Sequence, residues 1–135
     1  MSLIEAAILT ALAGFGYLII EFCIKPYLSY RKAVGEIEYA LRYYAPVSGM
    51  TKRDIQDQAH SAHRGNASRL QTSVHQSLFL QLLCACSILP RIELIDEAYR
   101  GLIGLSNAVY LTNDHRIIDQ HRQKIIKNLR LKGFQ

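Results

Sequence analysis

The sequence predicts an all-α protein in which one N-terminal transmembrane helix precedes a cytoplasmic bundle of four or five helices. The chain has 135 residues, the length of one domain. Its first 24 residues hold two charges, both acidic, whereas the other 111 carry all 16 Lys and Arg and a net charge of +7. Apolar residues then recur at helical steps, and no stretch alternates as a strand does. We expect a membrane anchor over residues 1–25 and a helical domain over 26–135.

Residues 3–24 form an apolar stretch of 22 residues. At about 1.5 Å per residue it gives roughly 33 Å of helix, against about 30 Å of hydrocarbon in a bilayer. Two alternatives stay open. A cleaved signal peptide would need a basic leader and a small-residue cleavage site, and both are missing here. A buried soluble helix is compatible with the 15 uncharged residues between the two glutamates.

Basic residues follow this stretch and none precedes it. Lys25, Arg31 and Lys32 come directly after it. The positive-inside rule therefore predicts a single-pass inner-membrane protein with its N-terminus outside and its C-terminus in the cytoplasm.

One face of the predicted transmembrane helix carries small and polar residues. Steps of three and four residues align Ala7, Thr10, Gly14, Tyr17 and Glu21. Small residues allow two helix backbones to approach, and hydroxyl groups can hydrogen-bond across the contact. This face predicts a homo-oligomer that associates in the membrane. The alternative is a lone anchor in which Glu21 pairs with Lys25 one turn later.

Proline, glycine and capping residues divide the following chain into helices. Pro26 disfavours a helical conformation for the residue before it, so a kink or the start of a new helix is expected there. The helix that follows Pro26 is expected to end near Tyr44. Thr51 with Asp54 resembles a capping box and begins the next helix. We expect that helix to continue through a weak point at residues 65–66.

Residues 78–89 are a second apolar run, in which only Gln81 and Ser87 are polar. Twelve residues are too few to span a bilayer as a helix. We interpret the run as a segment of the core. Contact with the bilayer from the cytoplasmic side is the alternative.

Two further helices complete the predicted bundle. The first starts at Pro90, and its Gly101 and Gly104 leave room for a close neighbour. Thr112 or Asn113 is expected to cap the second.

Basic residues are concentrated after the apolar stretch and on the last helix. Those expected to face the membrane or a partner are Lys25, Arg31, Lys32, Arg122, Lys124, Lys127 and Arg130. Such residues attract anionic headgroups. A nucleic acid is not expected as a partner, because stacking aromatic residues and recognition motifs are missing. A solvated basic face remains the simpler interpretation.

No residue pattern predicts catalysis. The sequence has neither a nucleophile elbow nor a glycine-rich phosphate loop. His60 and His63 lie one helical turn apart, but a metal site needs further ligands that the sequence does not supply. Cys84 and Cys86 lack the second half of a zinc pattern. We therefore expect no enzyme, no metal and no cofactor.

Three segments carry a resemblance: residues 30–45 (YRKAVGEIEYALRYYA), 89–91 (LPR) and 102–107 (LIGLSN). In these the chain resembles an uncharacterised family of small bacterial single-pass inner-membrane proteins with a helical cytoplasmic domain. The resemblance implies a bacterial inner-membrane location. It supplies no active-site residues.

These observations support two hypotheses about function. The first is a non-enzymatic, self-associating membrane protein, such as a membrane-acting effector of a bacterial defence system. Its partners would be the lipid bilayer and further copies of the chain. The second is a membrane tether or accessory subunit for a separate enzyme or complex, in which a different protein is the partner.

Overall fold

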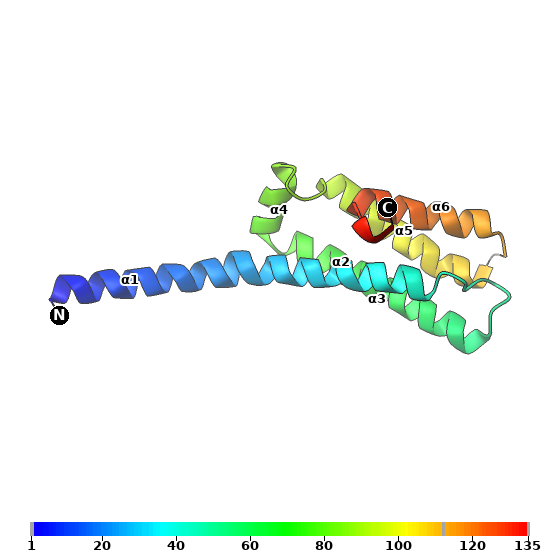
Figure 1. Cartoon of the computed structure of the whole chain (residues 1–135), viewed down its shortest axis with the longest axis horizontal. Coiled ribbons are helices and arrows are strands. Elements are labelled where there is room, and N and C mark those ends of the chain that lie inside the picture. The colour runs from blue at the N-terminus through cyan, green and yellow to red at the C-terminus, as the bar shows by residue number, and fades with distance from the viewer. Residues whose placement is uncertain (1, 112, 135) are drawn as a thin grey trace.

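The computed structural model describes residues 2–111 and 113–134, and within these ranges it is all-helical (Figure 1). The elements are α1 (Leu3–Ile19), the π-helical turn η1 (Ile20–Ile24), α2 (Lys25–Tyr43), α3 (Arg53–His75), α4 (Leu78–Ala85), α5 (Ile92–Leu111), α6 (His115–Leu129) and a 3-10 turn, η2 (Lys132–Phe134). The predicted all-α class is confirmed.

A capping box begins the first helix. The Ser2 hydroxyl accepts a hydrogen bond from the Glu5 backbone N–H at 3.2 Å, and the Glu5 carboxylate accepts one from the Ser2 N–H at 2.9 Å. This reciprocal pair satisfies two backbone donors that no helical carbonyl can reach. Glu5 therefore stabilises the helix start.

The first helix continues without a break into the bundle. α1, η1 and α2 form one helix, Leu3–Tyr43, which Figure 1 shows running from the free N-terminal end along the other helices. Pro26 does not interrupt it, in contrast to the predicted kink or new helix. In η1 the Lys25 N–H donates to the carbonyl of Ile20, five residues earlier. This wider π turn accommodates a residue that has no N–H and whose ring crowds the preceding turn.

α3 is one unbroken helix through residues 65–66, as predicted. Its predicted capping box is wrong. Lys52 is the N-cap residue and makes no side-chain cap. The Thr51 hydroxyl instead accepts a hydrogen bond from the Ser48 N–H at 2.9 Å. Thr51 thus closes the turn before the helix instead of capping the helix itself.

α6 is capped by a different residue from the two expected. The Asp114 carboxylate accepts a hydrogen bond from the Arg116 N–H at 2.9 Å. The cap is therefore one residue after Asn113, the nearer of the two predicted caps, and the helix begins at His115. The other, Thr112, lies outside the described residues.

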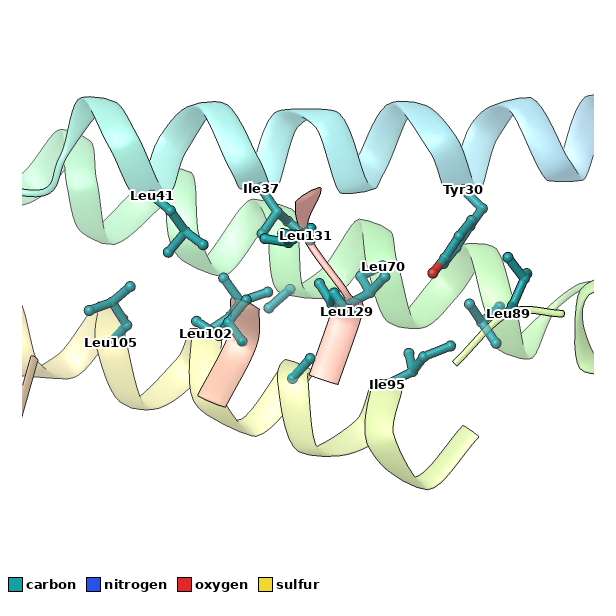
Figure 2. Close-up of a cluster of buried hydrophobic side chains, with 14 of the residues drawn as sticks. Tyr30, Ile37, Leu41, Leu70, Leu89, Ile95, Leu102, Leu105, Leu129 and Leu131 are labelled. Atoms are coloured by element: carbon teal, nitrogen blue, oxygen red, sulfur yellow. The ribbon is translucent and has the colours of Figure 1, made fainter. Parts of the chain in front are cut away.

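The hydrophobic core lies between α2, α3, α5 and α6. Figure 2 shows Ile37 and Leu41 of α2 directed towards Leu102 of α5 and Leu70 of α3. All four side chains are buried. The buried residues of each helix recur at helical steps, so each helix buries one face and exposes the other. α5 packs against both α3 and α6 and is the central helix of the bundle.

Two glycines of α5 allow α6 to approach closely, as predicted. A Cβ atom added at Gly101 would lie 2.9 Å from Cγ1 of Ile125. One added at Gly104 would lie 2.5 Å from Cε1 of His121. The space next to these glycines is therefore occupied by side chains of α6.

Candidate functional site: the uncovered apolar helix and a basic cavity

α1 is an apolar helix that the rest of the described chain does not cover. None of its residues is buried. It is the first part of the continuous helix Leu3–Tyr43, which is long and apolar enough to cross a membrane. Figure 1 shows it extending beyond the bundle. The core of this chain therefore does not provide the apolar surroundings that such a helix requires.

The predicted association face runs along uncovered α1 into η1, and two of its polar side chains, Thr10 and Glu21, are satisfied within the helix. The Thr10 hydroxyl donates to the Ala6 carbonyl at 2.8 Å. Glu21 pairs with Lys25, four residues later. An added Cβ at Gly14 would meet nothing within 4 Å. The face is thus open to a neighbouring helix, and its polar residues are also compatible with a lone anchor.

Three of the seven predicted basic residues are paired within the fold. Besides Lys25, these are Lys124 and Arg122. The Lys124 ammonium lies 2.5 Å from the Glu97 carboxylate, and this contact lowers the pKa of Glu97. The Arg122 guanidinium donates to the Leu41 carbonyl at 3.3 Å and pairs with an Asp119 carboxylate oxygen at the same distance. Lys124 and Arg122 therefore help to fix α6 to its neighbours.

The other four, Arg31, Lys32, Lys127 and Arg130, are exposed. The structure brings two of them together, although they lie near opposite ends of the chain. Arg31 of α2 and Arg130, just after α6, line one surface cavity of about 290 Å³, together with Lys132. The acidic side chain in its lining, Glu38, is paired with Arg42 at 2.8 Å. The cavity is therefore positively charged. We refer to it as the basic cavity.

The basic cavity cannot be located from the sequence alone, because its residues come together only when α2 and the end of α6 pack. Its lining also includes Ile88 and Pro90, which join α4 to α5. It therefore lies beside the apolar segment that follows α3.

The two histidines considered as metal ligands do not act together. His60 Nδ1 lies 2.8 Å from the Ser106 carbonyl oxygen. His63 is buried, and its Nδ1 has no hydrogen-bond partner. Among residues 2–111 and 113–134, no group of three or more His, Cys, Asp or Glu residues is arranged to hold a metal ion.

Comparison with protein-family models, with curated proteins and with solved structures finds no match. The resemblance to small bacterial inner-membrane proteins therefore stays a prediction. The geometry of the chain itself is the basis for the function proposed below.

Proposed function

We propose that the protein is a non-enzymatic, single-pass membrane protein of the bacterial inner membrane that self-associates through α1. The observation that carries this proposal is the contrast along one continuous helix. Its second half, α2, buries Ile37 and Leu41 in the core, whereas none of the residues of α1 is buried. An apolar helix held clear of its own domain is stable in lipid or against other copies.

Charge supports the proposed orientation. Lys25, Arg31 and Lys32 follow the span, and no Lys or Arg precedes it. This asymmetry favours an external N-terminus and a cytoplasmic bundle. Because α1 continues into α2, a rotation or tilt of the span would move the bundle with it.

The role that we propose for the assembly is a membrane-acting effector, as in bacterial defence systems. Copies that meet through the face with Thr10 and Gly14 would place polar side chains at the centre of the contact. A polar seam between apolar helices is a route by which an assembly can alter the bilayer.

Replacing Thr10 and Gly14 with leucine is expected to convert the oligomer into a monomer. Leucine side chains would separate the helix backbones and remove their close packing. Light scattering of the detergent-solubilised full chain should show the mass falling to that of one chain. The same variant should abolish any loss of membrane potential that follows induction of the unmodified chain in cells.

The matched control is Gly16→Leu. Gly16 is also a glycine of α1 with nothing within 4 Å of an added Cβ. It lies about 200° from Gly14 around the helix, so its substitution should leave the mass unchanged. An unchanged mass for the Thr10 and Gly14 variant would rule out association through this face.

A tether or accessory subunit is the second candidate. It is favoured by the Glu21–Lys25 ion pair and by the bond from Thr10 to Ala6, because these two polar side chains are satisfied within the helix and do not require a partner helix. Pull-down of the full chain from native membranes separates the two candidates. A stoichiometric second protein would support the tether, and copies of the same chain alone would oppose it.

A further inference from the structure

α4 is apolar apart from Gln81, whose side-chain amide donates to the His75 carbonyl at 3.0 Å, and only one side of the helix is covered. Leu80 and Cys84 are buried against the core. On the outer side Leu78 is 83% exposed and Leu82 is 59% exposed, and Ile88 just beyond the helix is 65% exposed. The outer face has no covering element among the described residues. We refer to Leu78, Leu82 and Ile88 as the outer apolar face.

This face lies in a long uncharged segment. No charged residue occurs from position 76 to position 90. A short helix with a single polar residue and apolar residues on its other positions is typical of a protein core or of a lipid environment. Packing against the core explains the apolar residues on the inner side of α4 but not those on its outer side. The interpretation of residues 78–89 as a core segment is therefore correct for the inner side and does not account for the outer side.

The position of α4 indicates what covers its outer face. α4 packs against η1, the last turn of the proposed span, and against α2. Figure 1 shows it at the end of the bundle from which α1 leaves, running across the direction of the long helix. Residues 3–24 extend for roughly 33 Å, against about 30 Å of hydrocarbon. A span of this length places η1 at the inner edge of the hydrocarbon, and α4 lies beside η1.

The charges around the outer apolar face match a lipid surface. Ile88 is exposed just beyond α4 and also lines the basic cavity with Arg31, Arg130 and Lys132. Apolar side chains flanked by cations are the pattern of segments that lie in the interfacial layer of a membrane, with the apolar groups among the acyl chains and the cations at anionic headgroups.

We propose that the outer apolar face rests in the cytoplasmic interfacial layer of the same bilayer that α1 crosses, with the basic cavity against anionic headgroups. This inference rests on the proposed function, because it requires α1 to span the membrane. It adds a second membrane contact, made by α4. Two contacts hold the bundle against the lipid surface and limit its rotation about the span.

The absence of tryptophan from the sequence provides a direct test. A single tryptophan introduced by Leu82→Trp, or by Leu78→Trp, would be the only indole in the full-length protein. Either position is exposed, so the substitution does not enlarge the core. Each variant is reconstituted into vesicles of phosphatidylcholine and phosphatidylglycerol that contain acyl chains brominated near the headgroup or near the methyl end.

We expect Leu82→Trp and Leu78→Trp to lose most of their emission with bromine near the headgroup, and less with bromine near the methyl end. The matched control is Leu111→Trp, because Leu111 is 82% exposed at the end of α5. It should keep its emission with both lipids. Equal emission from all three variants would overturn the proposal.

A fourth variant separates this inference from the proposed span. Phe15→Trp places the indole on uncovered α1, where deep bromine should quench it most strongly. Quenching of Phe15→Trp without quenching at positions 78 and 82 would overturn the α4 contact and leave the span intact. Absence of quenching in Phe15→Trp would instead contradict the span on which both proposals depend.

Discussion

Acidification from pH 7 to pH 4 is expected to lower the free energy of unfolding of the helical domain by about 3 kcal/mol through His63. Burial, with smaller effects of Arg122 and His60, lowers the pKa of His63 from 6.5 to about 4. Only 2% of the side chain is exposed, and its Nδ1 has no hydrogen-bond partner. The imidazole is therefore neutral in the folded state, and a shift of this size corresponds to about 3 kcal/mol.

The sign of the effect follows from proton binding. Between pH 6.5 and pH 4 the unfolded chain binds a proton at His63 and the folded chain does not. Stability therefore falls as the pH decreases through this window. Above pH 6.5 the histidine is neutral in both states, and its contribution is constant.

Chemical unfolding of the detergent-solubilised full chain at several pH values measures this dependence. His63→Leu removes the titrating group without breaking a hydrogen bond to Nδ1, and it should reduce the slope of the curve between pH 6.5 and pH 4. The control is His115→Leu, because His115 is exposed at the start of α6. It should retain the slope of the unmodified chain. A full slope in His63→Leu would show that other groups cause the acid sensitivity.

Replacing Gly101 with leucine is expected to destabilise the helical domain by about 2–3 kcal/mol. An added Cβ already lies 2.9 Å from Cγ1 of Ile125, and the remaining leucine atoms extend into the same contact. Ile125 is fully buried and cannot turn towards solvent. Overpacking of this kind forces α5 and α6 apart and typically costs about 1–3 kcal/mol. Thermal unfolding followed by circular dichroism measures the change.

A glycine elsewhere in the bundle should respond in the opposite direction. Gly65 lies inside α3, and an added Cβ there would meet nothing within 4 Å. Gly65→Ala is therefore expected to stabilise the domain by about 0.5–1 kcal/mol, because alanine restricts the unfolded backbone and favours the helix. Destabilisation by Gly65→Ala, or no effect of Gly101→Leu, would contradict the helix packing described above.

Local patterns in the sequence predicted much of the helical architecture. Apolar residues recur at helical steps, as Ile37 and Leu41 do on α2 and Ile95 and Leu102 do on α5, and this recurrence predicts helices in both regions. Gly101 correctly indicated a close helix contact. These features depend on residues within a few turns of each other, and such residues share a helix face whatever the tertiary structure.

Features that depend on packing between distant segments were not predictable in the same way. The basic cavity requires Arg31 and Arg130 to meet across the bundle. The two sides of α4 were not separated, because a run with so few polar residues carries little periodic signal. The π turn before Pro26 also differs from the expected break, since a proline alone does not distinguish a kink from a locally widened helix.

The central claim is that α1 crosses the bilayer with its N-terminus outside, and protease accessibility tests it most directly. The full chain carries a different epitope tag at each end and is made in a bacterial host. We predict that protease added to intact spheroplasts removes the N-terminal tag, and that the C-terminal tag is lost only after lysis. Survival of both tags on intact spheroplasts, or loss of the C-terminal tag alone, would contradict the claim.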